Sequence, residues 1–237
     1  MNMKWWMIVT VEAGIAWPTE ETSIDFMGHQ LFLRPPTSDQ AADVRIQYKH
    51  PSDEYQAFET VLRFLSTLSW SRRSPARARL RIACTYPMRG GKGNNDPCLC
   101  AGFSPSNLQL PTDPKACLAI ALYREARSIR NTPYEFLGYF KIINICYRTG
   151  QEQTKWINET IPLLTDDKAK QRIKQLKSQE EDISAYLYQS GRCAVAHASV
   201  DPVVDPDNPN DFLRLSADMP VARALAEYLM ENELGLS

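Results

Sequence analysis

The feature that most constrains the fold of this 237-residue chain is a change of hydrophobic period near its middle. In the first half, apolar residues alternate with polar ones or form short β-rich runs, as they do in strands. From Asp113 almost to the end, apolar residues recur every three or four positions, as in amphipathic helices. The two periods predict an α+β protein: a strand-rich α+β domain at 1–88, a linker at 89–112 and an all-α helical bundle at 113–237.

The first half contains a helical segment among strand-like ones. The expected elements are strands at 4–12, 22–35, 43–50 and 76–87 and a helix at 53–70. Segment 22–35 is expected to form two strands joined by a turn at Met27 and Gly28. Segment 43–50 alternates as a half-buried strand does. These elements do not form regular strand–helix–strand crossovers, so the first half alone already has α+β character.

The stretch between the two halves is rich in Gly, Pro, Asn and Ser. Its sequence GGKGNN superficially resembles a phosphate-binding loop, but Lys92 is not followed by Ser or Thr and no strand leads directly into it. We therefore expect a flexible loop. Cys98 and Cys100 form a C-x-C pair without a second pair or a nearby histidine, so the sequence predicts neither a metal site nor a cofactor.

Capping residues divide the second half into helices. Asp113 followed by Pro114 begins the first, and Thr132 has capping-box spacing to Glu135 at the start of the second. Further helices are expected at 152–161, from Thr165 to the region of residue 197 as one helix or two nearly continuous ones, and at 218–235. Short connections between these helices favour antiparallel neighbours in a bundle.

Composition limits the location of the protein. No apolar run reaches the roughly 18 to 20 residues that cross a bilayer, and the first residues lack the small-residue cleavage site of a signal peptide. Several of the six cysteines fall in apolar helical patterns, where a reduced cysteine behaves as a small hydrophobe. These observations predict a cytoplasmic protein without a membrane segment.

Charge is distributed unevenly along a chain whose net charge is only −1. Residues 60–95 contain no acid and eight basic residues, whereas residues 198–237 contain eight acids and two arginines. A block of positive charge suits RNA phosphates or an acidic partner. The candidate substrate-binding residues in this block are Arg72, Arg73, Arg77 and Arg79. The alternatives are that the block docks onto the acidic end of the same chain or is simply solvated.

The segment GRCAVAH contains the candidate catalytic residues Arg192 and His197, near the expected end of a helix. On an ideal helix their side chains point about 140° apart, so they are not neighbours as residues three or four apart would be. A shared site requires Arg192 to curl around the helix or a second copy of the motif to approach. The alternative is structural: His197 favoured as a cation at a helix C-terminus and Arg192 facing solvent.

An all-α domain with Arg-x4-His in its last helix but one resembles the HEPN superfamily (higher eukaryotes and prokaryotes nucleotide-binding). The sequence of residues 121–150 is similar to the paired helices of its ApeA-like branch. Together with residues 193–215, the same stretch also resembles the methylamine utilisation protein J family. The resemblance covers roughly residues 113–237.

This resemblance implies a metal-independent endoribonuclease of the toxin or phage-defence kind, in which two copies of the motif meet in a homodimer. His197 would exchange protons with the ribose 2′-hydroxyl or the leaving 5′-oxygen, and Arg192 would bind the phosphate. The implied partners are RNA, a second copy of the chain and a protein partner or antitoxin. Cys193 departs from the polar residue that often follows the arginine. The alternative is therefore a non-catalytic accessory or interaction protein.

Overall fold

The structure is a computed structural model that describes residues 4–91, 98–99, 108–179, 182–199 and 201–237. The chain divides into two units, Met1–Thr112 and Asp113–Ser237. The first contains an antiparallel sheet and the second is helical, so the predicted α+β class is confirmed. Lys92, Cys100 and most of GGKGNN lie outside the described residues.

The described residues of the first unit form a sheet of five strands in the order β3-β4-β5-β1-β6, and every neighbouring pair is antiparallel. Its strands are β1 (Trp5–Ala13), β3 (Thr22–Phe26), β4 (His29–Arg34), β5 (Asp43–Tyr48) and β6 (Ala76–Cys84). β2 (Ala16–Trp17) and β7 (Cys98–Leu99) form a separate parallel pair. The strands of the main sheet lie where the hydrophobic pattern predicts them.

The hairpin between β3 and β4 has the predicted two-residue turn. Met27 and Gly28 have φ of 53° and 73°, and Phe26 pairs with His29 on either side of them. Positive φ at both central residues matches the right-handed twist of the flanking strands. Glycine reaches this conformation without steric cost, which makes the pair a reliable hairpin signal.

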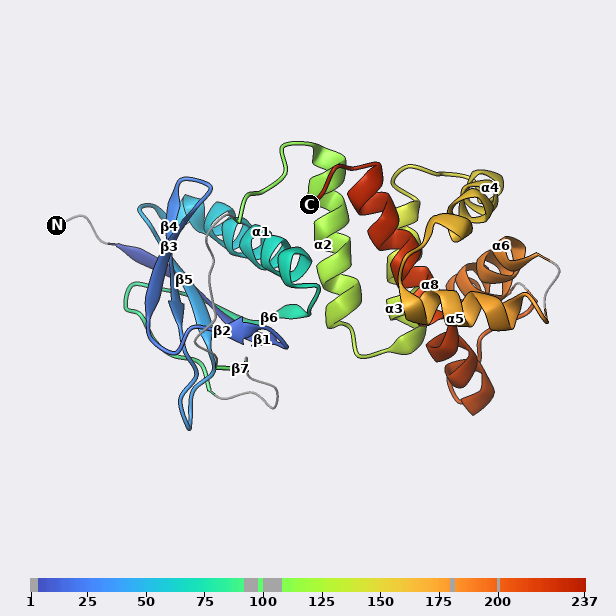
Figure 1. Ribbon diagram of the computed structural model, residues 1–237. Coiled ribbons are helices and arrows are strands. Elements are labelled where there is room, and N and C mark those ends of the chain that lie inside the picture. Colours follow the sequence, from blue (N-terminus) through green and yellow to red (C-terminus); the bar gives the residue numbers. More distant parts are fainter. Residues whose placement is uncertain (1–3, 92–97, 100–107, 180–181, 200) are drawn as a thin grey trace. The chain divides into compact units, whose positions relative to one another are not determined.

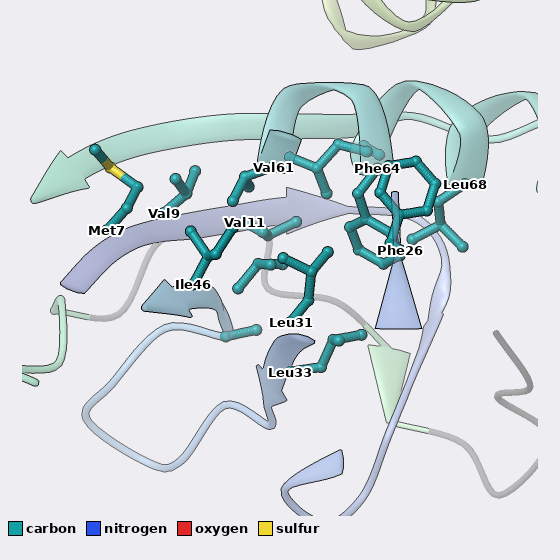
Figure 2. Packing of buried hydrophobic residues seen from close by; sticks show 14 of the residues in the cluster. Met7, Val9, Val11, Phe26, Leu31, Leu33, Ile46, Val61, Phe64 and Leu68 are labelled. Atoms are coloured by element: carbon teal, nitrogen blue, oxygen red, sulfur yellow. The ribbon is translucent and has the colours of Figure 1, made fainter. Parts of the chain in front are cut away.

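One helix covers one face of the sheet. It is α1 (Glu54–Arg72), preceded by the 3-10 turn η1 (Pro51–Asp53) (Figure 1). Figure 2 shows Val61, Phe64 and Leu68 of α1 pointing toward the apolar side chains of the strands. The rings of Phe26 and Phe64 meet edge to face at 5.6 Å. This layer of helix on sheet forms the hydrophobic core of the unit.

The opposite face of the sheet is also covered, so the expectation that 43–50 forms a half-buried strand is wrong. Five of the six residues of β5 are buried, including Asp43 and Arg45. Arg45 donates to Asp43 and to the carbonyl of Met88, which lies after β6. A Cβ added at Gly90 would clash with Cγ2 of Thr10. The segment after β6 therefore packs closely against this face. Asp43 and Arg45 beneath it are polar, so the sequence suggests that they are exposed, but the segment buries them.

The described parts of residues 89–112 also contact the first unit. Gly91 forms a bridge with Gln40, and β7 pairs with β2. Leu108 and Leu110 pack against the core. These contacts agree with the division of the chain after Thr112.

The second unit is built from helices α2 to α8. Its helices are α2 (Pro114–Ser128), α3 (Thr132–Ile143), α4 (Gly150–Thr160), α5 (Asp167–Leu176), α6 (Ile183–Tyr186), α7 (Ala194–Ala196) and α8 (Pro209–Asn232). A 3-10 turn, η2 (Ile161–Leu163), follows α4, and a π-helical segment, η3 (Leu187–Cys193), joins α6 to α7. α3 packs between α2 and α8, and α5 packs on α8. Among the described helices, none is long and apolar enough to cross a membrane.

The caps of these helices are only partly those predicted from the sequence. Asp113 caps α2 by accepting from the amide of Ala116, as predicted. The cap of α3 is Asn131 and not Thr132, because the Asn131 side chain accepts from the amide of Tyr134. The expected start of the last helix near residue 218 is also wrong.

The last helix, α8, begins at Pro209, with Asn208 as its cap. Proline favours the first turn, where its missing N–H costs nothing. Pro220, predicted to mark the start of the helix, lies inside it. The additional turns carry Leu215 and Asp218, both fully buried, so tertiary contacts extend the helix through the proline.

Candidate functional site

The motif, Arg192 to His197, lies at the end of an irregular helix, residues 183–196, that we call the motif helix, and His197 is the residue after it. Its central part, Leu187–Cys193, is π-helical. A π-helical turn contains more residues than an α-helical one and is often found at functional sites. Two close contacts accompany it: a Cβ on Gly191 would lie 2.6 Å from the Phe136 ring, and a Cβ on Gly150 would lie 2.6 Å from the hydroxyl of Tyr188.

A buried polar network fixes the start of the motif helix. Asp218 of α8, with only 1% of its surface exposed, accepts hydrogen bonds from the Tyr186 hydroxyl and from Nε of Arg172, each at 2.8 Å. Burial and then the nearby carboxylate of Asp218 raise the pKa of Tyr186. The tyrosine therefore stays protonated and keeps donating to Asp218. This network joins α5, α6 and α8.

Arg192 and His197 meet in the structure. Nη1 of Arg192 lies 3.4 Å from Nε2 of His197, and its Cζ lies 5.5 Å from the ring centre of Tyr188. The long arginine curls around the helix, which is the first of the two routes expected from the sequence. His197 also leaves the helical conformation, with φ of −132° and ψ of 122°, and this turns its side chain from the direction an ideal helix gives. The ideal separation of about 140° is therefore wrong for this pair.

The pair is accessible and carries no counter-charge from the described residues. His197 is exposed and Arg192 is half-buried. Among the ion pairs of the described side chains, none includes either residue. Two of the acids that follow the motif have other partners: Asp211 accepts from the amide of Asp205, and Asp205 accepts from the amide of Asp207. Among the described residues, no ion pair joins these acids to Arg192 or His197.

The contact also limits the tautomer of His197. A guanidinium group only donates hydrogen bonds, so this contact is a hydrogen bond only in the tautomer whose Nε2 is unprotonated. An unprotonated imidazole nitrogen at the surface can accept a proton from a ligand hydroxyl. Cys193 also accepts from Arg192 Nη1, at 3.6 Å from its sulfur. The arginine is thus held by weak, neutral partners that a phosphate can replace.

The basic residues predicted to bind substrate lie in the first unit, two at the end of α1 and two on β6. Arg72 ends α1, and Arg73 caps it with its guanidinium carbon 3.1 Å from the centre of the Trp70 ring. Arg77 is exposed on β6, where it pairs in register with Glu12. Arg79 forms an ion pair with Glu12 at 3.5 Å.

The register of β6 explains why its arginines separate. Paired residues on neighbouring strands share a face. Arg81 is opposite Val9, which points into the core beneath α1, whereas Arg77 is opposite Glu12 on the other face. A bulge between these pairs changes the alternation along β6. The sequence pattern showed the positive charge but not this division.

Metal ligands are not gathered in the described parts of the chain. No group of three or more His, Cys, Asp and Glu side chains there is placed to hold a metal ion. The motif is therefore the strongest candidate site on the helical unit.

Comparison with known proteins relates this unit to one family. Residues 119–231 match the model of the family described as methylamine utilization protein MauJ. The matched stretch is a little under half of the chain and includes the motif helix and most of α8. No curated protein and no solved structure matches the chain. The predicted resemblance to the methylamine utilisation protein J family is thus supported over this stretch, and the assignment to the HEPN superfamily stays a prediction.

Proposed function

We propose that the helical unit acts as a metal-independent endoribonuclease, with Arg192 and His197 as its catalytic residues. The observation that carries the proposal is the 3.4 Å contact between their side chains at an exposed point of the unit. Cleavage of RNA by its own 2′-hydroxyl needs a proton acceptor beside a group that binds phosphate. The motif offers both within one helix end.

In the proposed reaction, the ribose 2′-oxygen forms a bond to phosphorus and the bond from phosphorus to the 5′-oxygen breaks. Nε2 of His197 accepts the proton of the 2′-hydroxyl. The leaving 5′-oxygen receives a proton from an imidazolium, either the same one or that of a second copy. Arg192 binds the non-bridging oxygens as their negative charge grows. The products are a 2′,3′-cyclic phosphate and a 5′-hydroxyl.

The geometry suggests how substrate prepares the site. Arg192 contacts Nε2, the nitrogen that must accept the proton. A phosphate attracts the guanidinium more strongly than neutral imidazole or thiol does. Binding of the phosphate therefore draws Arg192 from Nε2 and leaves this nitrogen available to the 2′-hydroxyl.

A homodimer through the helical unit belongs to the same proposal. It is supported by exposed apolar side chains that follow the motif in the sequence: Val203 in the next segment, and Phe212 and Leu213 in the first turns of α8. The amide of Val204 donates to the carbonyl of Ala194 and so holds that segment against the end of the motif helix. Contact between two copies would cover these side chains.

The test is incubation of the purified full chain, treated with a chelator, with mixed RNA. We expect fragments with cyclic phosphate ends from the wild type and none from His197→Ala or Arg192→Gln. His50→Ala is the matched control, because His50 is an exposed histidine of the first unit and should not affect cleavage. Intact RNA with the folded wild-type protein would contradict the proposal.

The second candidate is a non-catalytic accessory or interaction protein of the methylamine utilization protein MauJ type. The family match over residues 119–231 favours it, and so does Cys193, because a thiol beside Arg192 is a weak hydrogen-bond donor. A protein partner, including an antitoxin, would then use the same exposed surface. This candidate predicts intact RNA with wild type and His197→Ala alike, while the Arg192–His197 surface is still required for binding the partner.

A further inference from the structure

The aromatic ring of Tyr188 lies beside the guanidinium of Arg192. Tyr188 belongs to the π-helical part of the motif helix, four positions before Arg192. The guanidinium carbon of Arg192 is 5.5 Å from the centre of the Tyr188 ring, within the range of a cation–π contact. Tyr188 is half-buried, whereas His197, which the same guanidinium contacts, is exposed.

The Tyr188 ring also packs closely against the first residue of α4. A Cβ on Gly150 would lie 2.6 Å from the Tyr188 hydroxyl oxygen, 2.7 Å from Cζ and 2.9 Å from Cε1, so any larger residue there would force the ring to move. The start of α4 is held by a capping box. The amide of Glu152 donates to Oγ1 of Thr149, and the amide of Thr149 donates to the Glu152 carboxylate. The position of the ring is thus set by α4 as well as by the motif helix.

A cation–π contact restrains Arg192 without occupying its N–H donors. The guanidinium contacts His197 and Cys193 at 3.4 and 3.6 Å, and both contacts are weak. A long arginine side chain has many accessible rotamers, so weak partners alone restrain it little. The ring attracts the cation through its π-face and leaves the N–H groups available to a phosphate. The contact with Tyr188 can therefore persist when a phosphate replaces the other two partners.

We propose that Tyr188 is the positioning residue of Arg192 and that Gly150 at the start of α4 sets the position of its ring. The ring holds the guanidinium beside Nε2 of His197 in the free protein and beside the phosphate in the complex. Tyr188 takes no part in proton transfer. Its role in cleavage rests on the proposed ribonuclease function, whereas the positioning of Arg192 can be measured without RNA.

The first test records the imidazole NMR resonances of His197 in the full chain labelled at histidine, without RNA. His197→Ala assigns these resonances among those of the three histidines. Arg192→Gln should shift them, because it removes the guanidinium 3.4 Å from Nε2. Tyr188→Leu should reproduce most of this shift, since the guanidinium is then no longer held. Tyr188→Phe should reproduce little of it, because the ring is kept.

A double-mutant cycle shows whether Tyr188 acts through Arg192. In the Arg192→Gln background, Tyr188→Leu should cause no further shift of the His197 resonances. Equal shifts in both backgrounds would overturn the proposal, because the tyrosine would then act on the fold or on His197 directly. Unchanged resonances in Tyr188→Leu would also overturn it. Tyr134→Leu is the matched control, since Tyr134 is 58% exposed on α3.

A second variant tests the contact with α4 and leaves Tyr188 in place. Gly150→Ala should displace the ring and shift the His197 resonances in the same direction as Tyr188→Leu does. Gln151→Ala, at an exposed residue in the same first turn, is its control and should leave them unchanged. Resonances of the wild-type kind in Gly150→Ala would show that α4 does not set the position of the ring.

In the cleavage assay, Tyr188→Leu should lower kcat/KM by about fivefold, the loss of one cation–π contact. Tyr188→Phe should retain most of the activity. The two proposals fail separately. The expected NMR shifts in a protein that leaves RNA intact would remove catalysis and keep the positioning role. Cleavage that is lost in Arg192→Gln but unchanged in Tyr188→Leu would keep catalysis and remove the positioning role.

Discussion

Two arginines, one in each unit, have opposite surroundings. Arg45 is buried, with its side chain 4% exposed, and donates to both carboxylate oxygens of Asp43 at 2.6 and 3.0 Å. It also donates to the carbonyl of Met88 at 2.8 Å. Arg192 is half-buried and contacts an imidazole and a thiol at 3.4 and 3.6 Å. The first arginine is paired by strong acceptors and the second by weak ones.

Under the proposed function, this difference is that between a structural and a functional arginine. A buried arginine that is paired in this way is expensive to disturb, because either partner alone would be an uncompensated charge in the core. An arginine on weak neutral partners loses little when a phosphate replaces them. The same residue type therefore stabilises the sheet in one unit and is available to a ligand in the other.

The largest effect is expected at the buried pair. Asp43→Ala should lower the free energy of unfolding of the first unit by about 3–5 kcal/mol, because it leaves Arg45 buried without its partner. Urea unfolding followed by tryptophan fluorescence measures this, since four of the five tryptophans lie in the first unit. Asp39→Ala, at an exposed acid, is the control and should change stability by less than about 0.5 kcal/mol. Equal losses would show that the Arg45 pair is not structural.

A smaller effect is expected where the motif helix meets α3. Gly191→Val adds side-chain atoms at a position where even a Cβ would be 2.6 Å from the buried Phe136 ring. Overpacking of this kind should destabilise the second unit by about 2 kcal/mol and displace Arg192. Unfolding is followed by circular dichroism. Gln189→Val, on the exposed side of the same helix, should have little effect, and similar losses for both variants would contradict this packing.

The hydrogen bond from Tyr186 to Asp218, which supports the motif helix, should be lost at alkaline pH. Burial raises the pKa of Tyr186 in the folded state above its ordinary value of about 10. The hydrogen bond of Tyr186 therefore stabilises the fold fully below pH ~10, and this stabilisation is lost as the pH rises through the folded-state pKa. Tyr186→Phe should cost about 1 kcal/mol near neutral pH. The difference between wild type and variant should shrink above pH ~10, measured by urea unfolding across the pH range.

The control for this pH dependence is Tyr134→Phe, because Tyr134 is exposed on α3. Its stability should follow that of the wild type at every pH. A constant cost for Tyr186→Phe up to the alkaline limit would show that the tyrosine does not support the motif helix through its proton.

The smallest effect on stability, with the largest on activity, is expected at the motif. Arg192→Gln and His197→Ala remove exposed or half-buried groups without strong partners, so each should change the free energy of unfolding by less than about 0.5 kcal/mol. The proposed cleavage should be lost in both. A loss of stability as large as that of Asp43→Ala would place Arg192 with Arg45 among the structural arginines.

The elements that are predicted correctly from the sequence are those determined by residues close together in the chain. Alternation and β-rich runs locate the strands, the Met27–Gly28 pair locates a hairpin, and Asp113 begins α2, because each depends on neighbouring residues alone. Errors appear where tertiary contacts decide. α8 begins earlier than expected, since buried residues before Pro220 stabilise its first turns, and Asp43 and Arg45 are buried by a distant segment.

The candidate site is predicted in its residues but not in its geometry. An ideal helix separates Arg192 from His197, whereas the real helix has a π-helical segment and an extended residue at His197. Neither irregularity is visible in a helical wheel, although Gly191 weakens regular helix beside the motif.

The position of β6 at the end of the sheet has a consequence for association. An edge strand can add strands from other molecules and so begin aggregation. β6 has charged side chains at Arg77, Arg79 and Arg81 and a bulge opposite β1, both of which make an edge a poor template. Substitutions that remove these three charges would therefore make the edge of the sheet a better template for association between copies of the chain.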